Sequence, residues 1–516
     1  MIVMLTIWAN KLKIAYPILL VLAGLGVSFI PSLPVVSIDP DLIFFIFLPP
    51  LLYEASWTIS FKEMKKWWRI IGSFAFLVVF FTAFLVAIVA NKYIPGFSIA
   101  LGFVLGGIVS PPDAVSTGAI TKFVKIPKTT SAILEGESLL NDASSLIILR
   151  FALVAVGSGQ IIWQEAAVDF LWMLFGGVGI GLVIAFVFMR IHKKWSTDAA
   201  SDTALTLIAP YFMYWLAEQV HCSGVLAVVS GGLLMSWKRL DFLSSSSRIN
   251  GYSVWQSFVF ILNGIVFLLI GLELPEIVSG IRANGIPLST AIGYGILVTA
   301  VLIGARIISS YIALLSTIIF RRNIARGMKL SRRSWLSPLI LGWTGMRGVV
   351  SLAAALSIPL SLNGAPYPHR NLILFITFVV ILLTLVVQGL TLPYVINKLQ
   401  PFRSMEVVEE KHAETRLQIK RGLKQHVYNH IKSKYENDEK WIGHAGMQKI
   451  LKHWEDQTNT QDIRWIDEHI KVVLLEMFEL QRQYLSELNK DPEIDEELIR
   501  SQIYQIDLEE ERIRYV

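Results

Sequence analysis

The sequence predicts an all-α polytopic membrane protein with a polar helical tail, and three observations support this fold class. Hydrophobic residues make up 54% of the 516 positions, and the mean hydropathy is +0.55. Charged residues make up 17%, against about a quarter in average soluble domains. The charges are unevenly placed, with 44 among residues 1–400 and 42 among residues 401–516. We therefore divide the chain into a membrane domain, 1–400, and a tail, 401–516.

The composition excludes several classes of protein. Cys222 is the single cysteine, so no disulfide framework can hold the chain together. Lys and Arg outnumber Asp and Glu by 46 to 40, but the basic residues of the membrane domain lie between apolar segments, unlike the basic patch of a nucleic-acid binder. We expect membrane lipid as a partner, no nucleic acid, and no ordinary soluble enzyme.

Apolar segments account for most of the first 400 residues. A membrane-spanning helix needs about 20 predominantly apolar residues. A first segment, Met1–Ala9, is only about half this length, so the first helix is short or truncated and the count is twelve or thirteen. The twelve longer segments are 14–30, 42–60, 70–91, 97–120, 133–157, 166–189, 203–219, 222–237, 254–274, 287–320, 336–360 and 371–397.

Basic residues predict the orientation of these helices. Successive loops between the helices lie on opposite sides of the membrane. The loops on one side carry 21 Lys and Arg residues in total, and the loops on the other side carry three. Cytoplasmic loops are enriched in Lys and Arg, so the loops of the first side and the tail are predicted to be cytoplasmic. The prediction is the same for thirteen helices and for twelve helices with a cytoplasmic N-terminus.

Two segments are interrupted at comparable places. Segment 97–120 contains Pro111 and Pro112, and segment 336–360 contains Gly342, Gly345 and Gly348. Adjacent prolines break a helix, and a break inside the membrane is tolerated only where it faces protein or water. The two segments are seven apart, so they run in opposite directions, which predicts an inverted repeat with two crossed broken helices and a binding site near the bilayer midplane.

Ionisable residues inside the apolar segments are few, and such residues are usually functional because a charge in hydrocarbon is costly. Asp142 lies nine residues into segment 133–157, about 13 Å along a helix and near the bilayer middle. Glu137 lies five residues earlier, about 140° around the helix, so the two carboxylates point in different directions. Arg306 is a candidate partner for Glu137. Asp142 has no such partner within its own helix, which suits a group that binds a proton and a cation in turn.

Oxygen ligands for a monovalent cation lie in the same segments, and hard cations prefer oxygen. The Ser138 hydroxyl, the Glu54 carboxylate and carbonyl groups freed at Pro111–Pro112 are candidates. The expected metal is thus a transported monovalent cation at Asp142, with no resident cofactor. One carboxylate that holds either one H⁺ or one Na⁺ exchanges charge one for one, so the cycle is electroneutral and does not draw on the membrane potential.

At these residues the chain resembles the monovalent cation/proton antiporter superfamily, in the branch of bacterial and animal Na⁺/H⁺ exchangers. The hallmark Gly-Glu-Ser-Leu-Leu-Asn-Asp stands unbroken at Gly136–Asp142. The resemblance covers roughly residues 10–400 and the end of the tail. Four further stretches are similar to family motifs: Phe47–Ser56, Leu302–Ser310, Gly342–Pro359 and, in the bacterial form, Asp491–Ile513.

The resemblance implies a secondary active antiporter that exchanges Na⁺, or also Li⁺ or K⁺, for H⁺ and serves pH and sodium homeostasis in a bacterial inner or plasma membrane. It implies a homodimer in which a core domain moves against a fixed dimerisation domain, and a protein that is not an enzyme and has no catalytic residues. By resemblance, Asp142 binds Na⁺ and H⁺ competitively, Asn141 orients the Asp142 side chain, and Ser138 and Glu54 are ion ligands. Glu137 and Arg306 form a structural ion pair. Arg347 compensates the helix-dipole ends where the two broken helices cross.

One motif departs from the family pattern, which commonly reads Thr-Asp-Pro-Val-Ala-Val. Here Ser110 keeps the hydroxyl and the carbonyl ligand, Pro111 replaces the usual acid, and Asp113 follows two residues later. Three roles stay open for Asp113: it caps the half-helix, it faces the ion path, or it only balances Arg347.

Three alternatives remain beside Na⁺/H⁺ exchange. A broad-specificity K⁺/H⁺ exchanger differs only in cavity size and ligand count. A gated cation channel needs an open polar path, usually with ring symmetry, against which the sparse and paired charges argue. An intramembrane hydrolase would use Asp113 and Asp142 as an aspartyl pair, against which the intact hallmark argues.

The tail, 401–516, is predicted to be a cytoplasmic, helical and regulatory domain. Amphipathic stripes predict helices near 470–488 and 496–513, and the polar stretch 457–462 predicts a loop. The sequence indicates no particular partner for the tail.

Overall fold

The computed structural model describes twelve stretches of the chain. They are residues 1–12, 15–30, 40–113, 128–158, 163–195, 198–283, 285–320, 334–362, 364–399, 405–435, 468–491 and 494–514. Two compact units are formed, the first from residues 1–194, 205–239 and 255–402, and the second from residues 195–204, 240–254 and 403–516. The predicted loop 457–462 lies outside the described residues.

Helices form nearly all of the described structure, which confirms the predicted all-α class; a two-residue strand pair, β1 (Ser361–Leu362) and β2 (Ala365–Pro366), is the exception among these residues.

The helices before the second broken segment are α1 (Ile2–Leu12), α2 (Tyr16–Ser28), α3 (Pro40–Thr58), α4 (Phe61–Gly72), the π-helix η1 (Ser73–Val78), α5 (Val79–Tyr93), α6 (Ile99–Val109), α8 (Lys128–Ser158), α9 (Trp163–Trp195), α10 (Ala199–Gln219), α11 (Gly224–Phe242), α12 (Ser245–Leu272), α13 (Leu274–Ala283) and α14 (Leu288–Phe320).

The remaining helices include both halves of the second broken segment. They are the 3₁₀ turn η2 (Ser334–Leu336), α16 (Ser337–Trp343), α17 (Val349–Leu356), α18 (Arg370–Leu383), the π-helix η3 (Thr384–Gln388), α19 (Gly389–Leu399), α20 (Met405–Tyr435), α22 (Glu468–Leu488) and α23 (Glu496–Arg514).

Six helical spans within the described residues are long and apolar enough to cross a membrane. Each of the twelve predicted segments coincides with one or more helices, and the short first segment forms α1. The number of spans is lower than twelve in part because the break leaves α6 only 11 residues long, too short to cross a membrane alone. The six spans are 61–93, 131–158, 168–195, 245–283, 288–316 and 370–396.

The basic stretch between the predicted segments 42–60 and 70–91 is helical and forms α4. The Ser60 hydroxyl accepts a hydrogen bond from the Glu63 N–H and caps α4, which then continues through η1 into α5. The stretch is amphipathic, with Ile71 buried and Trp68 exposed, so its charges can stay in water while the helix is formed.

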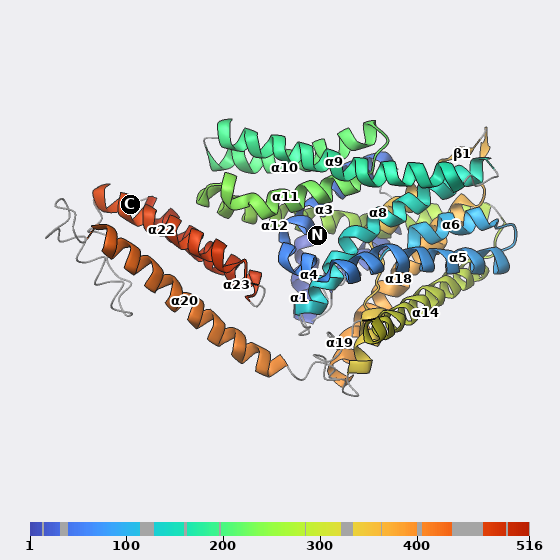
Figure 1. Cartoon of the computed structure of the whole chain (residues 1–516). Helices are drawn as coiled ribbons and strands as arrows, with labels where there is room; N and C mark the ends of the chain where they lie inside the picture. The colour runs from blue at the N-terminus through green and yellow to red at the C-terminus, as the bar shows by residue number, and fades with distance from the viewer. Residues whose placement is uncertain are drawn as a thin grey trace. The chain divides into compact units, whose positions relative to one another are not determined.

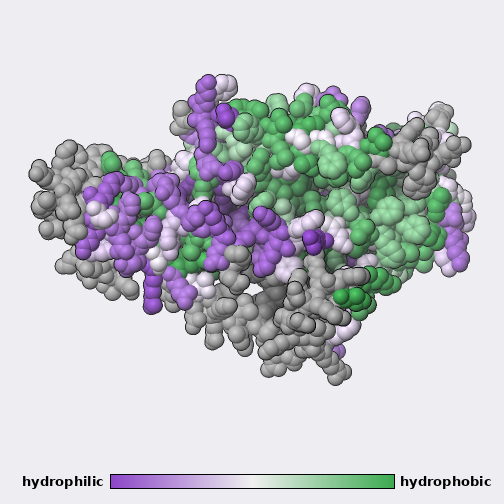
Figure 2. Space-filling view, in the orientation of Figure 1, coloured by the Kyte–Doolittle hydropathy of each residue, from purple (hydrophilic) through white to green (hydrophobic). Residues whose placement is uncertain are grey.

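Around the first break, α5, α6 and α8 pack side by side, with α14 against α5 (Figure 1). Gly102 and Gly106 let α6 approach α5 closely, because a Cβ at either position would overlap the backbone of Ala87 or Ala83. Large apolar side chains such as Trp172 and Phe175 stay exposed on α9. Hydrophobic residues also cover much of the first unit in Figure 2, as expected of a surface that faces lipid.

The second unit joins the tail to two short stretches, 195–204 and 240–254, which lie before the predicted boundary at residue 400. Helix α22 packs against α20 and α23, and Leu240 of α11 packs on their core. The helices predicted near 470–488 and 496–513 are present as α22 and α23. The core consists of Ile419, Leu423, Phe478, Leu485, Leu498, Ile499, Ile503 and Ile506.

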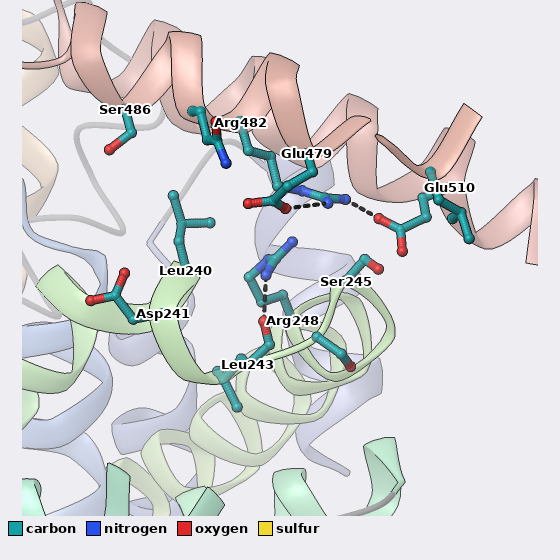
Figure 3. A pocket seen from close by; sticks show the side chains of 12 residues that line it. Leu240, Asp241, Leu243, Ser245, Arg248, Glu479, Arg482, Ser486 and Glu510 are labelled. Carbon is teal, nitrogen blue, oxygen red and sulfur yellow. Dashed lines mark hydrogen bonds and ion pairs between the residues drawn. The ribbon is translucent and has the colours of Figure 1, made fainter. Parts of the chain in front are cut away.

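A buried charge cluster, formed by Arg248, Arg482, Asp507 and Glu510, ties these segments together. Arg248 of α12 donates two hydrogen bonds to the carboxylate of Asp507 on α23, and Arg482 of α22 donates to both Asp507 and Glu510. Burial alone would lower the pKa of Arg482, but the hydrogen bond and charge of Glu510 and the charge of Asp507 raise it, so the guanidinium stays protonated. Both arginines line a cavity of about 400 Å³ (Figure 3).

Candidate ion-binding site

The break in the first crossed segment exposes a carbonyl group that α8 recognises. Helix α6 ends at Val109, and the prolines that follow cannot continue its hydrogen bonds. The Asn141 side-chain amide donates to the Pro112 carbonyl at 3.2 Å, and the Ser138 hydroxyl donates to the same oxygen at 3.4 Å. Two of the predicted site residues therefore meet the break directly. The remainder of this segment, residues 114–127, lies outside the described residues.

Asp142 lies beside these contacts, at the middle of its helix. It is the fifteenth of the 31 residues of α8, and it is 7% exposed. None of the described residues forms a hydrogen bond or an ion pair with its carboxylate. A buried carboxylate in this position, next to a polar backbone break, can bind a proton or a cation.

Glu137 and Arg306 form a bidentate ion pair across α8 and α14. Two guanidinium nitrogens of Arg306 donate to the two carboxylate oxygens of Glu137 at 2.6 and 3.0 Å. Both side chains are at most 3% exposed. The pair occupies Arg306 and leaves Asp142 unpaired among the described residues, in the arrangement expected from their 140° separation around the helix.

Arg347 and Asp113 lie where the two broken segments meet. The Arg347 Nε–H donates to the Val109 carbonyl at the end of α6 at 2.6 Å, where the negative end of the helix dipole favours a cation. The Asp113 N–H donates to the Met346 carbonyl at 2.7 Å. A Cβ on Gly348 would overlap the Asp113 carboxylate, so this acid lies against the residue that precedes α17.

The Asp113 carboxylate lies at the N-cap residue of α17, and the three roles considered for it stay open. A carboxylate at the start of α17 is stabilised by the positive end of the helix dipole. A basic residue, Arg347, thus lies at the C-terminal end of α6, and an acidic residue, Asp113, lies at the N-terminal end of α17.

Glu54 and Ser110 are less directly connected to Asp142. Glu54 is half-buried on α3, which packs against α8 and α17, but its carboxylate forms no described hydrogen bond with Asp142. Ser110 follows α6 and is 2% exposed; its hydroxyl donates to the Gly107 carbonyl.

One polar residue at the crossing was missed by the sequence analysis. The Thr384 hydroxyl accepts a hydrogen bond from the Arg347 N–H at 3.1 Å and so holds the extended link between α16 and α17. The signal that could have identified it is a hydroxyl in the otherwise apolar segment 371–397. Thr384 also begins the π-helix η3, a distortion that is frequent at functional sites.

Comparison with known proteins gives one consistent result. The model of the family described as "Sodium/hydrogen exchanger, transmembrane" matches residues 1–398. An uncharacterized Na⁺/H⁺ exchanger of Mycobacterium bovis is 29% identical over 98% of this chain and 93% of its own length. The Na⁺/H⁺ antiporter ApNhaP of Aphanothece halophytica is 32% identical over 75% of this chain and 70% of its own.

Two further similarities concern ion range and fold. The sodium, potassium, lithium and rubidium/H⁺ antiporter of Bacillus subtilis is 32% identical over 74% of this chain and 57% of its own length. The solved sodium proton antiporter MjNhaP1 from Methanocaldococcus jannaschii matches with a TM-score of 0.58 at 20% identity, over 75% of this chain and 96% of that one. At this identity the structural match supports the fold.

Proposed function

The chain belongs to the sodium/hydrogen exchanger family, a family of membrane transporters and not of enzymes, and from this premise we propose that it exchanges Na⁺ for H⁺ at Asp142. The coarser activity, monovalent cation/proton antiport, follows from the family. One observation carries the finer proposal: the Asp142 carboxylate is buried at the middle of α8, beside Asn141 and Ser138, which hold the Pro112 carbonyl.

The chemistry is a competition for one carboxylate. When Asp142 is ionised, its oxygens bind the cation, with hydroxyl and carbonyl oxygens at Ser138, Ser110 and the break as neutral ligands. When a proton binds, the negative charge that holds the cation is lost. Glu54 supplies a further carboxylate from α3, and Asn141 holds the break against α8. Arg347 and Asp113 compensate the helix ends, so that broken helices persist inside the membrane.

The exchange is proposed to be electroneutral, one cation for one proton. We expect the rate of Na⁺-driven proton movement in proteoliposomes to be the same at zero potential and at an imposed potential of about 100 mV, because one cycle moves no net charge, whereas each uncompensated charge would contribute about 2.3 kcal/mol. The potential is set with a thiocyanate gradient, and the proton movement is followed with a trapped pH dye. A rate that changes with the sign of the potential would contradict one-for-one exchange.

Na⁺ is proposed as the main ion, and a broad range that includes K⁺ and Li⁺ is the second candidate. The specific observation behind the second candidate is the similarity to the Bacillus subtilis protein, whose description names four cations. A ranking of proton movement after addition of Na⁺, Li⁺ or K⁺ separates the two. A gated channel is not supported, because the family consists of exchangers.

The location, oligomeric state and cellular role of the protein are proposed from its family and from its charge distribution. Membership of this family indicates a multi-pass membrane protein. We propose a bacterial inner or plasma membrane, a cytoplasmic C-terminus from the distribution of Lys and Arg, a homodimer in which a core domain moves against a dimerisation domain, and a role in pH and sodium homeostasis.

The tail is proposed to regulate exchange through the charge cluster of the second unit. Arg248 belongs to α12, a helix that begins in the second unit and continues into the first. Its side chain is 10% exposed, and that of its partner Asp507 is 2% exposed. A tail that holds the first turn of α12 in this way can bias a helix of the membrane domain.

We expect Asp507→Asn to loosen the tail and to change the exchange rate. The substitution weakens the contacts of the buried Asp507 with two arginines whose side chains are 10% and 12% exposed, and breaking a fully buried pair costs about 3–5 kcal/mol. Limited proteolysis of the tail and Na⁺-driven proton movement measure the two effects. Glu487→Gln is the control, because Glu487 pairs with Lys490 at the surface, where both side chains are more than 70% exposed. A tail that stays as protease-resistant as the wild type after Asp507→Asn would contradict the proposal.

A further inference from the structure

Ser351 carries a buried hydroxyl group for which the described residues provide no partner. It lies in α17 and is 1% exposed. An unpaired buried hydroxyl is destabilising, because it has lost its hydrogen bonds to water without gaining others. Two other serines avoid this cost by donating to a carbonyl three residues earlier: Ser145 of α8 donates to Asp142 at 3.0 Å, and Ser357, the C-cap residue of α17, donates to Ala354 at 2.9 Å.

The position of Ser351 relates it to the ion site. It is three residues after Gly348, the N-cap residue of α17, and so lies in the first turn of the helix. Gly348 lies against the Asp113 carboxylate. Asp113 follows Pro112, whose carbonyl accepts hydrogen bonds from α8. Helix α17 also packs against α3, α6 and α8, the helices that carry or adjoin the proposed ion ligands.

A second buried oxygen without a partner among the described residues belongs to the Asn141 side chain on α8. The Asn141 side-chain nitrogen donates to Pro112, but the Asn141 Oδ1 atom has no partner among the described residues, and the residue is 0% exposed. One unpaired oxygen thus belongs to Asn141, which contacts the break, and one belongs to α17, which packs against α6 and α8. Both are neutral and hard, which is the chemistry that a partly dehydrated monovalent cation requires.

We propose that the Ser351 hydroxyl is a further ligand of the transported cation, contributed by the second broken segment, and that Asn141 Oδ1 completes the coordination from α8. This inference rests on the proposed function and deepens it. Because a hydroxyl carries no charge, it leaves one-for-one exchange unchanged and contributes instead to cation affinity and to the choice among Na⁺, Li⁺ and K⁺.

The test compares three substitutions at Ser351 in the full-length protein. Ser351→Ala removes the oxygen, Ser351→Cys keeps the volume but replaces a hard oxygen with a soft sulfur, and Ser351→Thr keeps the hydroxyl. In proteoliposomes, the first two should raise the apparent KM for Na⁺ about tenfold, a change that corresponds to about 1.4 kcal/mol, with a smaller effect on the maximal rate. Ser351→Thr should keep an apparent KM close to that of the wild type. Ser357→Ala is the matched control at the C-cap of α17, because the Ser357 hydroxyl already donates to the Ala354 carbonyl.

A second readout is independent of transport. Na⁺ should raise the melting temperature of the detergent-solubilised wild type, and Ser351→Ala should require about tenfold more Na⁺ for the same rise. Unchanged apparent KM and unchanged Na⁺ dependence of the melting temperature would overturn the proposal, even if Ser351→Ala were less stable, since the hydroxyl would then serve only the fold. Should the alanine variant fail to fold, the cysteine variant decides.

Failure of the ligand proposal and failure of the proposed function give different results. If the wild type shows cation-driven proton movement and Ser351→Ala shows it with the same KM, only the ligand proposal is wrong. If the wild type shows none with any cation, the exchange itself is wrong, and the Na⁺ dependence of the melting temperature still decides whether Ser351 binds the ion.

Discussion

Asp142→Asn should abolish cation-dependent proton movement while the protein remains folded. The amide has nearly the size of the carboxylate, but it neither binds a proton at neutral pH nor supplies the charge that holds a cation. Because Asp142 is buried and forms no described hydrogen bond or ion pair through its side chain, removal of its charge leaves no partner unsatisfied. We expect a fall to the background of empty liposomes, measured with a trapped pH dye, and a melting temperature no lower than that of the wild type.

Glu135→Gln is the matched control for this variant. Glu135 lies on the same helix, seven residues away, but it is exposed and accepts a hydrogen bond from the Ser131 hydroxyl. The substitution removes one carboxylate charge from α8 but leaves Asp142, Asn141 and Ser138 in place, so exchange should persist. Proton movement that survives Asp142→Asn at the rate of the wild type would show that another group carries the proton.

Breaking the Glu137–Arg306 pair should damage the fold as well as transport. Glu137→Gln leaves the Arg306 guanidinium buried at 3% exposure without its counter-charge, and such a loss costs about 3–5 kcal/mol. The same reasoning applies to Arg306→Met, which leaves the Glu137 carboxylate alone. We expect a markedly lower melting temperature for each single variant and less protein recovered from the membrane.

The double variant Glu137→Leu with Arg306→Met tests whether the loss of stability in the single variants comes from the one buried charge that each leaves unpaired. A buried ion pair replaced by apolar side chains of similar volume is often neutral for stability, so the double variant should recover most of the melting temperature that either single variant loses. Single variants as stable as the wild type would contradict the structural role assigned to the pair.

The parts of the site that sequence could predict depend on local periodicity. The five-residue spacing of Glu137 and Asp142 sets their different directions on one helix, and the double proline sets the end of α6. Both follow from backbone geometry over a few residues. The same holds for α22 and α23, whose apolar stripes repeat within the tail.

Contacts between distant segments could not be predicted in this way. The bond from Arg347 to the Val109 carbonyl joins residues 238 apart, and the Arg248–Asp507 pair joins residues 259 apart. No periodicity in either segment specifies the other. The helix over the basic stretch between segments 42–60 and 70–91 could not be predicted either: positive charge indicates an aqueous side of the membrane, but it does not indicate whether the chain there is helical, as α4 is.

Exchange at a single buried carboxylate is tested most directly with the wild-type protein in liposomes that contain a trapped pH dye. Addition of Na⁺ outside should make the interior more alkaline, because each entering cation drives one proton out, and Li⁺ or K⁺ should act to an extent that ranks the ions. Asp142→Asn in the same liposomes should give no response. A folded wild-type protein that gives no pH change with any of the three cations, or the same change without added cation, would contradict cation/proton exchange.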